Sequence, residues 1–245
     1  MQTNILDWLE ATAAHTPEGA AVGDAQQDYT WAQLAENARR AGSFLAGHTA
    51  PRCPVAFYLE KSAPVFAAML GTVYAGCCYS VLDTRQPAAR TQQVLSTLQP
   101  SLLITDRDHA DAAAALGCSC SVYLLDELLT AAVQPSLLAA RRAQAVDVDP
   151  LYINFTSGST GVPKGVTVSH RSVLDFIPQF AAIFGIKAQD ILGNQAPFDF
   201  DVSVKDLYTA LYTGAKVQII PRAYFSQPTK LMDYLCLLYT SDAAD

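Results

Sequence analysis

The sequence alternates between stretches with helical periodicity and short, uninterrupted apolar runs of strand length. Residues 31–47 repeat apolar side chains at the spacing of one helix face, whereas residues 54–59 are apolar throughout. Continuous apolar runs are typical of strands buried on both faces, which occur in parallel sheets covered by helices. The pattern therefore predicts an α/β fold of mostly parallel sheets flanked by helices.

The same alternation continues along the chain, and it sets the expected elements. Helices are expected after residue 3 and over residues 31–47, 64–75, 88–98, 108–116, from 169 onward, and 202–212. Strands are expected over residues 54–59, 102–105, 122–125, 151–155, 166–168 and 217–220. The connection over residues 131–149 reads as looser and partly helical. No repeat and no Gly/Ser-rich linker marks a domain boundary.

One charge-free stretch, residues 62–82, is long enough to be weighed as a membrane span. It contains Pro64, Gly71, Gly76 and Ser80, and it has few of the large aliphatic residues that drive insertion. A buried helix that runs into a buried strand explains it better, so no membrane partner is predicted. The N-terminus lacks the pattern of a signal peptide, which favours a cytoplasmic location.

Charge and cysteine usage exclude two further classes. The net charge is −7 and no cluster of lysine or arginine occurs, so a nucleic-acid partner is not expected. The six cysteines form no C-x-x-C pair and have no histidine at metal-ligand spacing. They read as reduced thiols, and no metal site is predicted from them.

Residues 155–165, Phe-Thr-Ser-Gly-Ser-Thr-Gly-Val-Pro-Lys-Gly, lie between two expected strands. Glycines let backbone N–H groups approach a ligand, and hydroxyls and a lysine add donors and charge for phosphate oxygens. The segment differs from the Walker P-loop, because Gly165 follows Lys164 where Ser or Thr would stand. The alternative is an ordinary hairpin turn, in which Ser, Thr and Gly are also common.

Residues 156–165 resemble the signature loop of the adenylate-forming (AMP-binding) superfamily. This superfamily includes acyl-CoA synthetases, luciferases, adenylation domains of nonribosomal peptide synthetases and D-alanine–carrier-protein ligases. Two weaker motifs follow the family's order: residues 29–34, where Gln33 replaces the usual acid, and residues 74–83, where Tyr74 and Ser80 depart from the pattern. The resemblance covers essentially all of residues 1–235.

The resemblance implies that the loop holds the β- and γ-phosphates of ATP while pyrophosphate leaves. The residues implied in nucleotide binding are Thr156, Ser157, Gly158, Ser159, Thr160, Gly161 and Lys164. A substrate carboxylate would attack the α-phosphorus, normally with Mg²⁺, in a reaction that rests on positioning and electrostatic stabilisation. Lys164 would stabilise phosphate charge, and the main catalytic lysine is expected outside this chain.

Residues 200–203, Phe-Asp-Val-Ser, resemble the Phe-Asp-x-Ser motif of amino-acid-activating members. In those members the aspartate, here Asp201, pairs with the ammonium group of the substrate, and acyl- and aryl-CoA synthetases generally lack it. The alternative is that Asp201 caps the helix over residues 202–212. We favour the ammonium role, and one residue can serve both.

The same helix face, with Val202 and Lys205, lines the side-chain pocket in the family. Lys205 would then favour an acidic or polar substrate. The plainer reading, which we favour, is a solvated lysine paired with Asp201 or Asp206, because lysines are mostly exposed. His170 is expected in the first turn of a helix capped by Ser169 rather than as a catalytic base, and Asp199 is expected to be structural.

Several expectations concern what lies beyond the domain. By resemblance, the aminoacyl-AMP would pass to the phosphopantetheine thiol of a carrier protein. Residues 236–245 resemble the translation of a transposon-end sequencing adapter, so a partial AMP-binding domain over residues 1–235 is expected. An acyl- or aryl-CoA ligase, and a fragment without activity of its own, remain alternatives.

Overall fold

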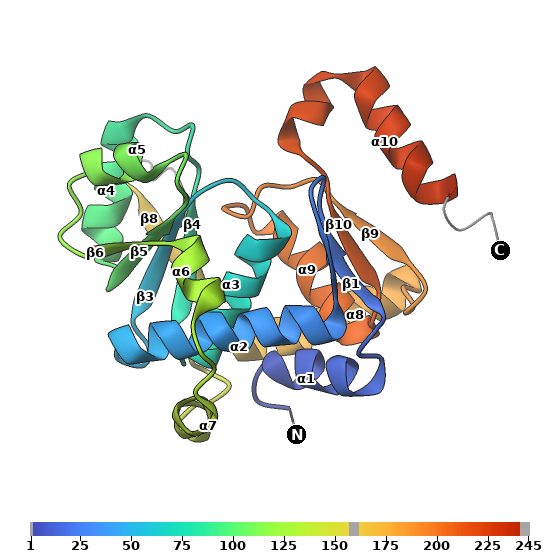
Figure 1. The fold of residues 1–245 in the computed structure, drawn as a ribbon, viewed down its shortest axis with the longest axis horizontal. Helices are drawn as coiled ribbons and strands as arrows, with labels where there is room; N and C mark the ends of the chain where they lie inside the picture. The colour runs from blue at the N-terminus through green and yellow to red at the C-terminus, as the bar shows by residue number, and fades with distance from the viewer. Residues whose placement is uncertain (1, 157–161, 241–245) are drawn as a thin grey trace.

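The computed structural model of the chain describes residues 2–156 and 162–240. Two mostly parallel sheets stand side by side and are covered by helices (Figure 1). The six-stranded sheet has the order β6 (Ser121–Leu124), β5 (Leu102–Thr105), β3 (Pro54–Tyr58), β4 (Cys78–Leu82), β7 (Pro150–Thr156) and β8 (Lys164–Ser169). The four-stranded sheet has the order β2 (Asp28–Thr30), β1 (Ala20–Gly23), β10 (Lys216–Ile219) and β9 (Ile191–Asn194). Among the strand pairs within the described residues, only β7–β8 and β1–β2 are antiparallel, which confirms the predicted α/β class.

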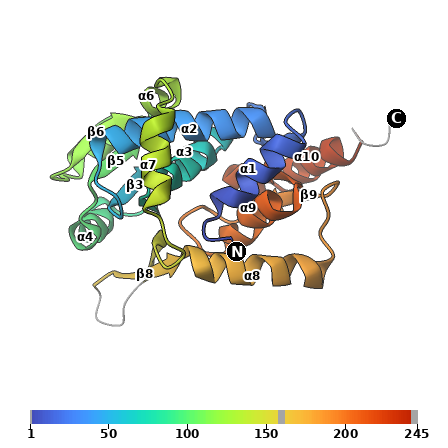
Figure 2. The same ribbon diagram turned by 90° about the horizontal axis from the view of Figure 1, so that it is seen from below.

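Helices cover the sheets and connect their strands. The first five are α1 (Leu6–His15), α2 (Trp31–His48), α3 (Ala63–Tyr74), α4 (Ala88–Leu98) and α5 (Ala110–Ala115). The others are α6 (Leu125–Thr130), α7 (Pro135–Ala143), α8 (His170–Phe184), α9 (Val202–Thr213), the 3₁₀ turn η1 (Arg222–Ser226) and α10 (Pro228–Thr240). Seen from below in Figure 2, α8 runs along one edge of the molecule, continuing from β8.

Strand β3 shows why the apolar runs are continuous. Val55 and Phe57 pack into the larger hydrophobic core together with α2 and α3. Ala56 and Tyr58 point to the other face and join a second core with α4 and α5. Successive side chains of a strand alternate between faces, so a strand covered on both sides is apolar at every position.

Helix α3 accounts for the charge-free stretch. It lies between the two sheets (Figure 1), and every one of its residues except Pro64 is buried. A helix buried all round has no face on which a charge could meet water. Within the described residues, no helix combines the length and hydrophobicity needed to cross a membrane, and α3 has only 12 residues.

Helix α3 crosses α2 at a point where both helices carry glycine. A Cβ atom on Gly71 would lie 2.5 Å from the Cβ of Ala41 and 2.9 Å from the carbonyl oxygen of Ala38. A Cβ atom on Gly42 would lie 2.5 Å from the Cβ of Tyr74. The missing side chains therefore let the two backbones approach closely.

The start of α2 explains one departure from the family pattern. Gln33 donates its backbone N–H to the Thr30 hydroxyl at 3.3 Å, and its side-chain oxygen accepts the Thr30 N–H at 2.9 Å. This is a reciprocal capping box, which glutamine completes as well as glutamate does. Gln33 therefore keeps the helix start that the motif requires.

The structure differs from the predicted elements at several places, and neither η1 nor α10 was predicted. Strands β1, β2 and β9 were not predicted. Strand β6 ends at Leu124, and Leu125 already begins α6. The backbone N–H of Leu124 donates to the Glu127 carboxylate at 2.9 Å, which starts the helix inside the apolar run.

Candidate functional site

The glycine- and hydroxyl-rich segment connects β7 to β8 as a hairpin at the edge of the six-stranded sheet. Thr156 pairs with Lys164 at its mouth, and both residues are exposed. Directly opposite residues of an antiparallel pair project to the same face, so a hydroxyl and an ammonium group stand together there. Ser157, Gly158, Ser159, Thr160 and Gly161 lie outside the described residues.

Neighbouring elements hold the hairpin in place. β7 joins the parallel part of the sheet through the pairing of Tyr152 with Tyr79 of β4. Arg90 of α4 donates to the carbonyl oxygen of Thr156 at 3.2 Å. Gly165 faces the ring of Phe155, and a Cβ atom there would lie 2.9 Å from Cγ2 of Ile153. The glycine after Lys164 is thus needed for packing across the strands.

A pocket of about 380 Å³ lies between the β7–β8 hairpin and helices α8 and α9. It is lined by Tyr152, Val168, Ser172, Val173, Phe176, Asp201, Val202, Val204 and Lys205. The three residues that the sequence nominates for substrate binding therefore meet in one cavity. Val202 also lines a second cavity of about 470 Å³, next to the connection between β9 and α9.

Asp201 precedes α9 without capping it. Its backbone is helical, with φ −59° and ψ −23°, and its side chain makes no capping hydrogen bond. The turn is closed by Ser203, whose hydroxyl donates to the carbonyl oxygen of Phe200 at 2.8 Å. The serine of the Phe-Asp-x-Ser motif thus has a local structural role, which leaves the aspartate directed at the pocket.

Tyr152 lines the pocket together with Asp201, and two further tyrosines pack behind it. Burial, and next the charge of Asp201, raise the pKa of Tyr152 to about 12. Tyr152 stacks on Tyr79 with ring centroids 5.8 Å apart. The Tyr79 hydroxyl meets that of Tyr208 at 2.7 Å, and burial raises the pKa of both groups. This bond fixes α9 against the six-stranded sheet.

Lys205 lies on the pocket face of α9, one turn after Asp201. Its ammonium group is 5.8 Å from the ring centroid of Phe180 on α8, within the range of a cation–π contact. Among the described residues it makes no ion pair with Asp201 or Asp206. The Asp206 carboxylate instead accepts from the Asn194 side chain at 3.0 Å.

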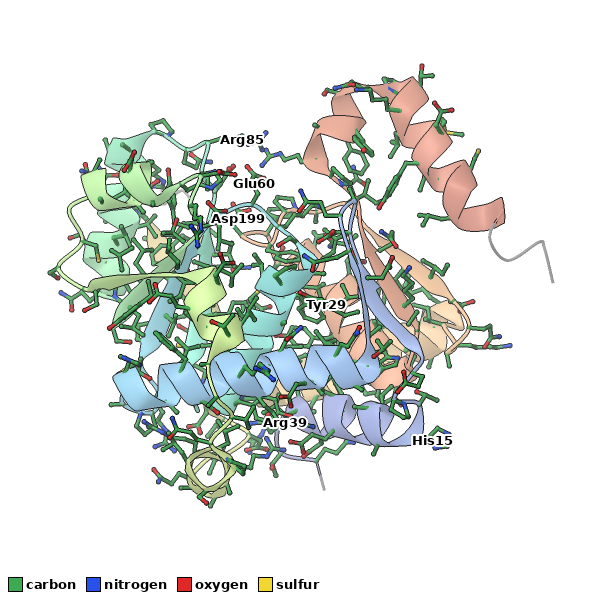
Figure 3. All side chains as sticks on the ribbon, in the orientation of Figure 1. His15, Tyr29, Arg39, Glu60, Arg85 and Asp199 are labelled. Atoms are coloured by element: carbon green, nitrogen blue, oxygen red, sulfur yellow. The ribbon has the colours of Figure 1, made fainter. Side chains whose placement is uncertain are left out.

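Two further polar residues have the places expected for structural groups. His170 begins α8, where the Ser169 hydroxyl accepts the N–H of Ser172 at 3.4 Å. Burial, and next the charge of Arg142, lower the pKa of His170 to about 4, so the ring is neutral at physiological pH. Asp199 lies near Glu60 and Arg85 in Figure 3, and burial raises its pKa.

The described part of the site fits a phosphate group better than a metal ion. Thr156 and Lys164 together offer a hydroxyl donor and a positive charge on one face of the hairpin. Nowhere in residues 2–156 and 162–240 do three His, Cys, Asp or Glu side chains gather as a possible metal site.

The family model for AMP-binding enzymes matches residues 9–237, which is most of the chain. The chain belongs to the AMP-binding enzyme family. Its members are adenylate-forming ligases that use ATP, and both adenylation domains and carrier-protein ligases are among its relatives. The order of strands and helices in this AMP-binding domain agrees with that assignment.

Curated relatives are named as synthetases, a synthase and ligases. Pyochelin synthetase PchF of Pseudomonas aeruginosa is 34% identical over 222 residues, covering 90% of this chain and 12% of PchF. Syringomycin synthase SyrB1 of Pseudomonas syringae pv. syringae is 33% identical over 229 residues, which cover 91% of this chain and 36% of SyrB1. A D-alanine–D-alanyl carrier protein ligase of Staphylococcus aureus is 28% identical over 233 residues, which cover 95% of this chain and 46% of the ligase. The chain thus spans less than half the length of these relatives.

Solved structures support the fold. The nonribosomal peptide synthetase FmoA3, in a form bound to α-methyl-L-serine-AMP, has a TM-score of 0.78 at 27% identity, covering 89% of this chain and 24% of FmoA3. The four-domain synthetase AB3403, bound to AMP and glycine, has a TM-score of 0.82 at 23% identity. This match covers 96% of this chain and 17% of AB3403, and it supports the fold alone.

Proposed function

We propose that the full-length parent of this chain activates the carboxylate of an amino acid with ATP. The observation that carries the proposal is the position of Asp201, which faces a pocket and does not cap its own helix. A carboxylate on a pocket wall favours a cationic group of the ligand. The α-ammonium group of an amino acid meets that requirement, whereas a simple fatty or aryl acid does not.

In the proposed reaction, a carboxylate oxygen of the amino acid attacks the α-phosphorus of ATP. The bond between the α-phosphorus and the bridging oxygen breaks, so that pyrophosphate leaves and an aminoacyl-AMP remains. Asp201 holds the ammonium group and thereby orients the attacking carboxylate. Val202 and Lys205 contact the amino-acid side chain, and the half-buried ammonium of Lys205 favours a polar or acidic one.

Lys164 and Thr156 would hold the departing phosphates from the mouth of the hairpin. The charge on those phosphates grows in the transition state, where a lysine is most effective. Ser157, Ser159 and Thr160 would add hydroxyl donors, Gly158 and Gly161 would let the backbone approach, and Mg²⁺ would accompany the nucleotide. The parent would act in the cytoplasm, where ATP is its co-substrate.

The proposed acceptor of the aminoacyl group is the phosphopantetheine thiol of a carrier protein. The thiolate attacks the acyl carbon, a thioester forms and AMP leaves. The relative named as a carrier-protein ligase supports this second step. An acyl- or aryl-CoA ligase is the alternative, since the same family chemistry serves those acids.

The test compares amino acids with their des-amino analogues in pyrophosphate exchange by the full-length parent. Asp201→Ala should weaken amino-acid binding by about 2–5 kcal/mol, since it leaves the ammonium unpaired. That corresponds to a rise in KM of roughly thirtyfold or more. Asp175→Ala, at an exposed position of α8, is the matched control. Equal turnover of an amino acid and its des-amino analogue would refute the assignment and favour the acyl ligase.

The chain over residues 1–245 by itself is expected to show no exchange activity. The chain spans only 12% to 46% of the curated relatives' length, and the resemblance implies a main catalytic lysine that is not among the nominated residues. Turnover by this chain with any amino acid would contradict that expectation. The boundary at residue 235 also stays a prediction, which sequencing of the intact gene beyond Leu235 tests.

A further inference from the structure

The ammonium group of Lys61 contacts four hydrogen-bond acceptors, although the proposed reaction gives this lysine no role. It follows β3 in the six-stranded sheet, and its ammonium group reaches the end of β9 in the other sheet. It donates to the Asn194 carbonyl oxygen at 2.9 Å and to the Asn194 side-chain oxygen at 3.0 Å. It also donates to the carbonyl oxygens of Gln195 at 2.8 Å and Ala196 at 3.2 Å. An ammonium group has three protons, so these four acceptors occupy it fully.

The acceptors belong to the segment that leads into the proposed substrate pocket. Residues 195–201 connect β9 to α9, and Asp201 is the last of them. Asn194 is fully buried, and its side-chain N–H donates to Asp206 of α9 at 3.0 Å. Lys61 therefore contacts both the start of the connection and, through Asn194, the helix that carries Lys205.

Without this ammonium group, three successive carbonyl oxygens would lose a charged donor. Hydrogen bonds to charged groups are stronger than those between neutral groups. The Asn194 carbonyl oxygen would keep the N–H of Ile220 at 3.1 Å, but the side-chain oxygen of this buried residue would lose the Lys61 donor, and a buried acceptor left unpaired is costly. The connection would then relax toward other donors or toward water. Because Asp201 lies at its far end, such a change would alter the direction of the Asp201 carboxylate.

We propose that Lys61 is a positioning residue for the substrate pocket, where it fixes the β9–α9 connection and so directs Asp201 toward the ammonium group of the amino acid. The inference rests on the proposed function. It adds a residue that touches neither substrate nor nucleotide, and that comes from the opposite sheet. A role in folding alone is the competing explanation.

The experiment measures pyrophosphate exchange by the full-length parent with Lys61→Met, Lys61→Arg and, as a matched control, Lys187→Met. Lys187 is an exposed lysine in the connection between α8 and β9, outside the pocket. Lys61→Met should raise the KM for the amino acid about tenfold or more, while the KM for ATP changes by less than about twofold. Lys61→Arg should restore the amino-acid KM to within about threefold of wild type, since a guanidinium also donates to several carbonyl oxygens.

Three results separate the explanations. An unchanged amino-acid KM in folded Lys61→Met would overturn the inference. A parallel rise of both KM values, together with lost thermal stability, would assign Lys61 to folding alone and would overturn it too. A wild-type parent that shows no exchange with any amino acid would overturn the proposed function, and the inference with it. Exchange by the wild type upholds the function whatever the variants do.

If Lys61→Met does not fold, the pH profile of Lys61→Arg decides. Burial lowers the pKa of Lys61 to about 8, although the negative charges of Asp206 and Glu60 act to raise it. Asp83, Asp199 and Arg222 are the other charged groups lining the same small cavity. Between about pH 7 and about pH 9 the lysine loses its charge, whereas an arginine keeps it. The wild type should lose more amino-acid affinity than Lys61→Arg over this range, and an equal loss would overturn the inference.

Discussion

Replacing Gly71 of α3 with alanine has two opposing effects on the stability of the fold. Alanine favours the helical backbone over glycine by about 1 kcal/mol. The added methyl group, however, would lie 2.5 Å from the Cβ of Ala41 and 2.9 Å from both the Ala38 carbonyl oxygen and the Gly42 nitrogen. These are backbone and Cβ atoms, which cannot turn away as a flexible side chain would.

Steric crowding should therefore prevail. Overpacking of a close-packed interior costs about 1–3 kcal/mol, and contacts with backbone atoms belong at the upper end. Subtracting the helix-propensity gain leaves a net destabilisation of about 2 kcal/mol. Gly47→Ala is the matched control, since it lies in α2 and a Cβ atom there would meet nothing within 4 Å. That variant should be about 0.5–1 kcal/mol more stable than wild type.

Urea unfolding followed by circular dichroism measures both changes. With a slope of about 2–3 kcal/mol per molar urea, Gly71→Ala should lower the midpoint by about 0.7–1 M. Gly47→Ala should raise it by about 0.2–0.5 M. If Gly71→Ala matched Gly47→Ala in stability, α2 and α3 would not be in close contact, and the arrangement of α3 between the sheets would be refuted.

Two further predictions concern the site. Lys164→Ala in the full-length parent should lower kcat for pyrophosphate exchange by about 10²–10³ with little change in the amino-acid KM, and an unchanged kcat would remove this lysine from the mechanism. Tyr208→Phe should destabilise the fold by about 1–3 kcal/mol, because it leaves the buried Tyr79 hydroxyl unpartnered. The double variant Tyr79→Phe/Tyr208→Phe should recover part of that loss in urea unfolding, and a double variant less stable than Tyr208→Phe would contradict the reasoning.

Much of the fold follows from local patterns in the sequence. Strands that run through the interior, such as β3 and β5, are apolar at every position and stand out against the periodic helices. Strand β9 escapes this signal because Ile191-Leu192-Gly193-Asn194 is short and contains a glycine and an amide. Strand β2 has only three residues, of which none is fully buried. Such strands form because a neighbouring strand offers hydrogen bonds, which no local pattern shows.

Some residues of the candidate site can likewise be predicted from the sequence, whereas others cannot. A contiguous motif brings Asp201 and Val202 to the start of α9, so the sequence is enough to nominate them. Lys61 meets Asn194 across 133 positions of the chain, and the Tyr79 hydroxyl meets that of Tyr208 across 129. Nothing near Lys61 in the sequence distinguishes it from a solvated lysine, because its partners are main-chain oxygens of a distant loop.

The hydrogen bond between the Tyr79 and Tyr208 hydroxyls also affects which pocket residues can be substituted while α9 keeps its position. Two buried hydroxyls tolerate little rotation of α9, since turning the helix would leave both without a partner. Leu207 and Leu211 are fully buried and hold the same helix from its inner side, whereas Val202 and Lys205 line the cavity. Exchanges at these two positions therefore alter the volume and charge of the cavity while the helix keeps its orientation. Under the proposed function, substitutions at these two positions would change substrate selectivity while α9 stays fixed against the sheet.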